Sequence, residues 1–173
     1  MKRRWCLQLL SALLMVAVLG GCEESVPQGP THLTNAPIPS AQCAPTDQDQ
    51  YVYHPLRLHI LQSCIRVSGV VRAIRTENDG DLHLQLEVDS PFQTFLEPAN
   101  SLEQGDLVVE PVCVTLPIQP DALATCVADN HPLTSLPTIG QHVWMEGRYV
   151  LDLEHGSWAE LHPLYRWGDE PAS

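Results

Sequence analysis

The stretch Asp81-Leu82-His83-Leu84-Gln85-Leu86-Glu87-Val88-Asp89 alternates between polar and apolar residues. Successive side chains of a strand point to opposite faces, so the alternation predicts a strand whose apolar even-numbered residues are buried and whose odd-numbered residues face water. The preceding Asn78-Asp79-Gly80 is typical of a tight hairpin turn. The stretch therefore predicts the second strand of a hairpin, and with it a β-rich fold.

Four more strands are expected around this one. The first runs from Cys64 to Arg75, and Gly69-Val70-Val71 breaks its alternation where a bulge would let a long strand bend. Three strands follow the hairpin: Leu107 to Val114 (interrupted by Pro111), His142 to Leu151, and Trp158 to Leu164.

The one helical candidate runs from Gln119 to Ala128, between the third and fourth strands, with proline and aspartate near its start. This order of elements predicts an all-β fold, a five-stranded OB-like barrel with one short helix. A small β-sandwich is the alternative, and its linking segment would not need a helix.

The first 22 residues have the parts of an export signal. Lys2-Arg3-Arg4 is positively charged, the stretch from Leu9 to Leu19 is apolar, and two glycines precede Cys22. Leu19-Gly20-Gly21-Cys22 resembles a bacterial lipobox, in which the signal is cut just before a cysteine that then carries acyl chains such as palmitate. The resemblance implies an exported protein anchored by lipid at Cys22; the alternative is a secreted protein cut elsewhere.

This reading divides the chain into a signal peptide (1–21), a lipidated cysteine with a proline-rich tether (22–50), an OB-like domain (51–167) and a C-terminal tail (168–173). Glu23 rather than an aspartate follows Cys22. By resemblance to sorted lipoproteins, this favours the outer membrane, at its periplasmic face, in a Gram-negative host.

The mature chain would be strongly acidic. Cleavage removes three of the nine basic residues and none of the 21 acidic ones, which leaves a formal net charge of −15. Such a charge repels nucleic-acid phosphates and anionic lipid headgroups. We therefore expect no nucleic-acid partner, and a membrane attachment that depends on the lipid.

Four cysteines remain after Cys6 is removed and Cys22 is lipidated. An even number in an oxidising compartment predicts two disulfides, with three possible connectivities. We favour Cys43–Cys64 and Cys113–Cys126, because each closes a short loop. A zinc site is the alternative, but the four cysteines include no close Cys-x-x-Cys pair.

Two carboxylate–histidine pairs are the candidate site. Asp81 and His83 share one strand face, Glu160 and His162 share another, and Glu110 stands near the end of the third strand. If the pairs converge, their oxygen and imidazole ligands suit zinc, manganese or iron. The alternatives are a structural polar network and uncoupled surface side chains.

Five ordered motifs resemble a family of bacterial secreted proteins and lipoproteins of uncharacterised function. They are Cys-x-x-Val-x-Gly-x-Val at 64–71, Glu-x-Asp-Gly-Asp-x-His at 77–83, Val-Val-Glu-x-x-Cys at 108–113, Gly-x-x-Val-x-x-x-Gly-x-Tyr-Val-x-Asp at 140–152 and Glu-Leu-His-Pro at 160–163. The resemblance implies an OB-like barrel and a polar site drawn from Asp81, His83, Glu110, Glu160 and His162. One departure is an extra residue in 155–160, where the family commonly reads His-Gly-Trp-x-Glu.

The expected function is that of a lipid-anchored binding or accessory module of the cell envelope, with an envelope protein, a glycan or a small ligand as partner. The alternative is a metal-dependent hydrolase with Asp81, His83, Glu160 and His162 as ligands and Glu110 as ligand or general base. Gly-x-Ser-x-Gly and P-loop motifs are absent from the sequence, which makes an enzyme the less favoured reading. A purely structural envelope protein is the third option.

Overall fold

Five strands and five short helices form the part of the chain that the computed structural model describes, residues 43–127, 133 and 135–170. The strands are β1 (Leu58–Thr76), β2 (Leu82–Val88), β3 (Leu107–Val109), β4 (His142–Asp152) and β5 (Trp158–Asp169). The helices are α1 (Leu123–Val127) and the 3-10 helices η1 (Asp47–Tyr51), η2 (Pro55–Arg57), η3 (Ser90–Phe95) and η4 (Pro98–Glu103).

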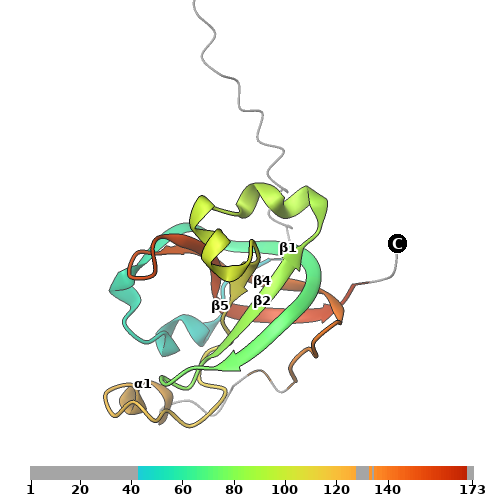
Figure 1. Cartoon of the computed structure of the whole chain (residues 1–173). Coiled ribbons are helices and arrows are strands. Elements are labelled where there is room, and N and C mark those ends of the chain that lie inside the picture. Colours follow the sequence, from blue (N-terminus) through green and yellow to red (C-terminus); the bar gives the residue numbers. More distant parts are fainter. Residues whose placement is uncertain (1–42, 128–132, 134, 171–173) are drawn as a thin grey trace, which may run out of the picture. The chain divides into compact units, whose positions relative to one another are not determined.

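The strands form one closed barrel in the order β1-β2-β3-β5-β4 (Figure 1). All neighbouring pairs are antiparallel except β3 and β5, which are parallel. Closure depends on the length of β1, which pairs with β4 from Leu58 to Val70 and with β2 from Gly69 to Thr76. The all-β prediction is confirmed, and a single closed sheet replaces the two packed sheets that a sandwich requires.

Gly69 lies where β1 passes from one neighbour to the other. A Cβ atom at this position would lie 2.3 Å from the backbone oxygen of Glu87, so only glycine allows the two backbones to approach this closely. The register of β1 against β2 shifts between Val71 and Ala73, just after the break in alternation that the sequence shows. Such an irregularity bends a strand and lets it serve two sides of a barrel.

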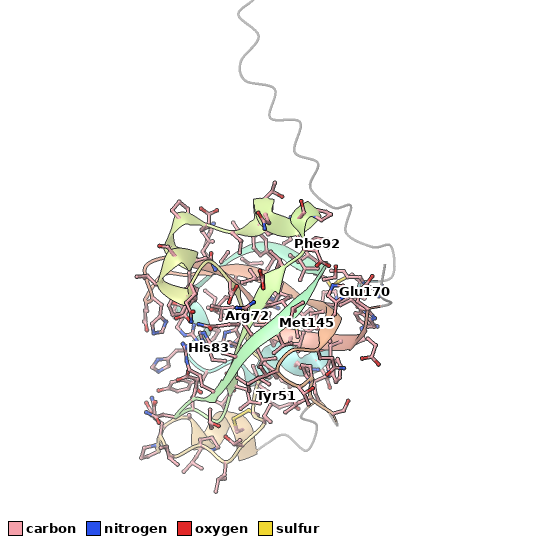
Figure 2. All side chains as sticks on the ribbon, turned by 45° about the vertical axis from the view of Figure 1, so that its right-hand side comes forward. Tyr51, Arg72, His83, Phe92, Met145 and Glu170 are labelled. Atoms are coloured by element: carbon pink, nitrogen blue, oxygen red, sulfur yellow. A yellow bond between two sulfur atoms is a disulfide. The ribbon has the colours of Figure 1, made fainter. Side chains whose placement is uncertain are left out.

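Apolar side chains of all five strands fill the barrel. Leu84, Leu86, Val109, Met145 and Leu161 are fully buried there, and Figure 2 shows Met145 among the central side chains. The apolar even-numbered residues of β2 therefore face the core, as their alternation predicts.

The prediction that the odd-numbered residues of β2 face water is wrong for His83 and Gln85, which are 2% and 5% exposed. The segment with η3 and η4 follows β2 and returns over this part of the barrel (Figure 1). Its last helical residue, Glu103, lies 3.2 Å from His83 Nε2 and accepts a hydrogen bond from Gln85 at 2.6 Å. The sequence of 90–103 has no clear periodicity, so this cover was missed.

Several elements have other bounds than predicted. β1 begins at Leu58 rather than Cys64, because its first half pairs with the end of β4. β3 ends at Val109 rather than Val114; the chain leaves the sheet at Pro111, and Cys113 has a positive φ of 52°. β5 continues five residues beyond Leu164, and α1 occupies only Leu123–Val127 of the predicted helix, whose last residue lies outside the described part.

The disulfides Cys43–Cys64 and Cys113–Cys126 are present, which confirms the predicted pairing. The folded part begins before residue 51, because η1 starts inside the predicted tether and its Asp49 accepts a hydrogen bond of 2.7 Å from the Tyr165 hydroxyl. The predicted signal peptide and Cys22 lie outside the described residues. Among the residues that are described, no helix has the length and apolar character to cross a membrane.

Candidate functional site

The barrel brings the five predicted site residues together through its strand register. Asp81 directly precedes β2, His83 lies on β2, Glu110 directly follows β3, and Glu160 and His162 lie on β5. In the parallel pairing of β3 with β5, Val109 is opposite Leu161, which places Glu110 next to His162. In the antiparallel pairing of β2 with β3, Leu84 is opposite Val109, which places Glu110 next to His83. All five are buried, with Glu110 the most exposed at 7%.

Carboxylates and imidazoles alternate through this buried cluster. Nδ1 of His83 lies 3.1 Å from Glu110 Oε1, and Nδ1 of His162 lies 2.7 Å from Glu110 Oε2 and 3.1 Å from Glu160 Oε1. The second nitrogen of His162, Nε2, faces Oδ2 of Asp81 at 3.7 Å. Glu110 is therefore the residue that joins the two histidines.

Two atoms of this cluster have no hydrogen-bond partner among the described residues: Oδ2 of Asp81 and Nε2 of His162. The other oxygen of Asp81 accepts a hydrogen bond of 2.7 Å from the backbone amide of Cys113. A buried polar atom without a partner costs free energy, so two that face each other mark an incomplete interaction.

Burial and mutual charge shift the protonation of this cluster. Burial raises the pKa of Asp81 to about 8, against the effect of His162. Burial by itself lowers the pKa of His162, but Glu110 and Glu160 outweigh it and raise that pKa to about 10. At neutral pH the described structure therefore holds His162 as a cation and Asp81 largely as the neutral acid.

The two glutamates respond in opposite directions. Burial favours a raised pKa for Glu110, but His162 and His83 outweigh burial and lower it well below its usual range. Burial and the charge of Glu110 raise the pKa of Glu160. Glu110 is thus the fixed anion of the cluster, and the protons lie on its neighbours.

Sequence reasoning missed the cation on the other side of Glu110. Arg57, which ends η2, forms an ion pair with Asp152 and lies 3.9 Å from Glu110 and 3.8 Å from Glu160. Its side chain is only 9% exposed. With so few basic residues in the chain, a search for partners of the buried carboxylates could have singled it out.

An aromatic pair lies at the edge of the cluster. The rings of His155 and Trp158 are parallel with centroids 4.9 Å apart, and Nδ1 of His155 lies 3.0 Å from Asp152. Trp158 donates a hydrogen bond of 2.8 Å from its indole nitrogen to Glu160. Ser157 has a φ of 65° in the turn that precedes β5.

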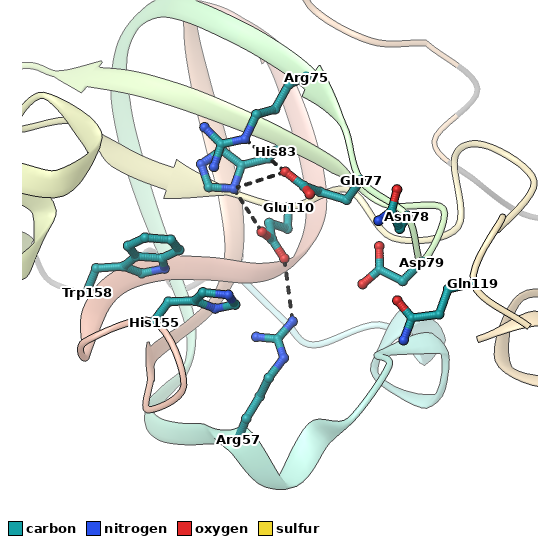
Figure 3. Close-up of a pocket in the computed structure, with 10 residues that line it drawn as sticks. All are labelled: Arg57, Arg75, Glu77, Asn78, Asp79, His83, Glu110, Gln119, His155 and Trp158. Carbon is teal, nitrogen blue, oxygen red and sulfur yellow. Dashed lines mark hydrogen bonds and ion pairs between the residues drawn. The ribbon is translucent and has the colours of Figure 1, made fainter. Parts of the chain in front are cut away.

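A pocket of about 260 Å³ opens beside this cluster, and Figure 3 shows Arg57 and Arg75 on either side of His83 and Glu110 within it. Of the five predicted site residues, only His83 and Glu110 line the pocket. The other lining residues are Arg57, Arg75, Glu77, Asn78, Asp79, Gln119, His155 and Trp158.

The described residues include one fully buried set that could hold a metal ion. One nitrogen of His162 and one oxygen from each of Asp81 and Glu110 lie within 4.8 Å of one another. A second set joins Asp81 to Cys113 and Cys126, but these two sulfurs are bonded to each other and cannot ligate a metal as thiolates.

No protein-family model, no curated protein and no solved structure matches this chain. The resemblance drawn from the five motifs therefore remains a prediction. The function has to be inferred from the buried cluster and the pocket beside it.

Proposed function

We propose that this chain is a lipid-anchored protein of the cell envelope whose barrel is a binding module for a small polar ligand. The observation that carries the proposal is the pocket between the β1–β2 turn, with Asn78 and Asp79, and the β4–β5 loop, with His155. OB-fold proteins bind oligonucleotides and oligosaccharides at the corresponding loops. This analogy rests on fold alone, so the ligand class has to come from the chemistry of the pocket.

The barrel is of the OB-like type in this proposal. Its support is the strand order β1-β2-β3-β5-β4, the parallel pairing of β3 with β5, and the position of α1 between β3 and β4. The bent β1, which pairs with both β2 and β4, supports the same assignment.

The lining favours a ligand with many hydroxyl groups, such as a glycan fragment of the envelope. The parallel rings of His155 and Trp158 offer an aromatic surface at one wall. Around it stand guanidinium, carboxylate and amide groups, including Arg75, Glu77 and Gln119, which donate and accept hydrogen bonds in several directions. The acidic charge of the chain argues against a polyanionic nucleic acid.

Ligand binding is tested on a soluble chain from residue 22 with Cys22→Ser, titrated with oligosaccharides and muropeptides by calorimetry and NMR. We expect the amide shifts of 77–83 and 152–158 to move together, and His155→Ala to weaken binding about tenfold. His142→Ala is the matched control, because His142 lies at the start of β4 and does not line the pocket. Binding that neither variant changes would contradict the pocket assignment.

Lipid anchoring at Cys22 is supported by the lipobox-like sequence and by two disulfides, which are compatible with export. We expect the wild-type chain to incorporate labelled palmitate and to sediment with membranes. Cys22→Ala should lose the label. A Cys22→Ala chain that still carries labelled palmitate would contradict the anchor.

The binding module has more support than the hydrolase alternative. A hydrolase needs its metal-bound water to reach a substrate. Asp81 and His162 are 1% and 0% exposed and do not line the pocket. The convergence of the five residues is the observation in favour of a metal, and it supports a bound ion more directly than a reaction.

A further inference from the structure

Oδ2 of Asp81 and Nε2 of His162 face each other across 3.7 Å in the buried polar cluster. Both atoms are buried, and neither has a hydrogen-bond partner among the described residues. Both are also metal-ligand atoms of ordinary type, a carboxylate oxygen and an imidazole nitrogen. The distance is too long for a good direct hydrogen bond, so neither atom is satisfied by the other.

The surrounding charges favour a cation in that position. Glu110, Glu160 and Asp152 are all buried, and their positive partners are the guanidinium of Arg57 and the imidazolium of His162, whose Nε2 proton a metal ion would replace. Buried carboxylates need compensating positive charge, from a basic side chain, a proton or a metal ion.

We propose that Asp81 and His162 bind a divalent transition-metal ion of the zinc type, with an oxygen of Glu110 as the third ligand. Zinc bonds to oxygen and nitrogen are about 2.1 Å long. A metal bonded to both Oδ2 of Asp81 and Nε2 of His162 would therefore have an oxygen–metal–nitrogen angle of roughly 120°, near the tetrahedral value. Glu110 is the third candidate ligand, because one of its oxygens lies within 4.8 Å of an oxygen of Asp81 and of one ring nitrogen of His162.

The other nitrogen of His162 supports this role. Nδ1 lies 3.1 Å from Glu160 and 2.7 Å from Glu110, so it keeps its proton toward a carboxylate, while Nε2 of His162 and the carboxyl of Asp81 each release a proton to solvent as the metal binds. Glu160 is itself fixed by the hydrogen bond from the Trp158 indole. A carboxylate that orients a metal-bound histidine in this way is a recurrent arrangement in metal sites.

His83 is not a ligand in this proposal, although the sequence made it a candidate. Both of its ring nitrogens face carboxylates, Glu110 at 3.1 Å and Glu103 at 3.2 Å. The proposed ligands come from the start of β2, the end of β3 and the middle of β5. The ion would therefore tie three strands together, and its expected effect is on stability as well as on binding.

The experiment uses the chain from residue 22 with Cys22→Ser, stripped with a chelator and titrated with zinc and, separately, with cobalt(II). We expect one zinc per chain by calorimetry and elemental mass spectrometry, visible absorption of tetrahedral type with cobalt, and a saturable rise in melting temperature. Asp81→Asn should weaken zinc binding at least about tenfold. His162→Gln should do the same, and circular dichroism in chelator shows whether each variant folds.

The matched control is Asp89→Asn, which removes the carboxylate from the partly exposed Asp89–His142 pair, 2.9 Å apart. It should bind zinc like the parent chain. The proposal is overturned if the parent chain takes up no zinc, or if folded Asp81→Asn binds zinc as tightly as the parent. It is also overturned if Asp89→Asn is the variant that loses the ion.

Discussion

Glu146 and Asp81 are both buried carboxylates of the same barrel, each 1% exposed, but their surroundings differ. Glu146 on β4 receives Arg66 at 2.6 Å on one oxygen and Arg166 at 2.8 Å on the other. Asp81 receives one backbone amide, that of Cys113, and its second oxygen faces His162 without a hydrogen bond.

The comparison separates a fully paired carboxylate from one whose pairing is incomplete. Two arginines satisfy both oxygens of Glu146, and Arg66 also lies 4.2 Å above the ring of Trp144. Glu146 therefore has no unpaired oxygen to offer a ligand. One oxygen of Asp81 has no hydrogen-bond partner in the described part of the chain, and the chain has few arginines that could pair with it. We therefore place an ion beside Asp81 and none beside Glu146.

The largest effect is expected at Arg57. Arg57→Met leaves Asp152, Glu110 and Glu160 without their shared cation, and removal of one partner from a buried ion pair costs about 3–5 kcal/mol. Urea unfolding measures it. Arg72→Met is the control, since the Arg72–Glu87 pair is more than half exposed and such pairs contribute about 0–1 kcal/mol. Equal losses of stability in both variants would contradict the role of Arg57 as the shared cation of these carboxylates.

Glu146→Gln is expected to lower the free energy of unfolding by about 2–3 kcal/mol, because charge-assisted hydrogen bonds are lost but the partly exposed arginines can regain water. Zinc affinity should not change. Unfolding curves with and without zinc test both statements. If Glu146→Gln abolished zinc binding, Glu146 and Asp81 would not have the separate roles that the comparison gives them.

The contribution of the Glu103 carboxylate to the stability of the fold should depend on pH. Burial favours a raised pKa for Glu103, but Arg75, Gln85 and His83 outweigh it and lower that pKa. A lowered pKa stabilises the fold above the unfolded value, about 4.3, and this stabilisation is lost as the pH falls below it. Glu103→Gln should cost about 1–2 kcal/mol at pH 7, and less as the pH approaches 3. A cost that is the same at both pH values would contradict the assignment.

The smallest effect is expected for Asp81→Asn in the presence of a chelator, below about 1 kcal/mol. Asparagine keeps a carbonyl oxygen for the Cys113 amide, and Asp81 is largely neutral at pH 7 because burial raises its pKa to about 8. Zinc should then stabilise the parent chain and leave the variant unchanged. A large loss without metal would make Asp81 a structural residue like Glu146.

The strands and the convergence of the five polar residues were predictable because their signals are local. Alternation in 81–89, the turn at Asn78-Asp79-Gly80 and the spacing of cysteines indicated the sheet and the disulfides. Carboxylate–histidine pairs two residues apart on strands selected side chains that the barrel then brought together. The strand, turn and carboxylate–histidine patterns depend on neighbours within a few residues. The two disulfides join cysteines 21 and 13 residues apart, still within one stretch of the chain.

The burial of His83 and the place of Arg57 were not predictable, because both depend on contacts between distant segments. His83 is covered through Glu103, 20 residues away, and Arg57 meets Asp152, 95 residues away. Alternation describes which face of a strand a residue occupies, and it carries no information on what a later loop covers. The incomplete pair of Asp81 and His162 likewise depends on the register of separate strands.

The most direct measurement is X-ray diffraction from crystals of the chain grown with zinc, with data collected on both sides of the zinc absorption edge. The account predicts one anomalous peak between Oδ2 of Asp81 and Nε2 of His162, within bonding distance of Glu110, and no peak at Glu146. A map without a peak between these atoms, with Asp81 hydrogen-bonded directly to His162, would contradict it.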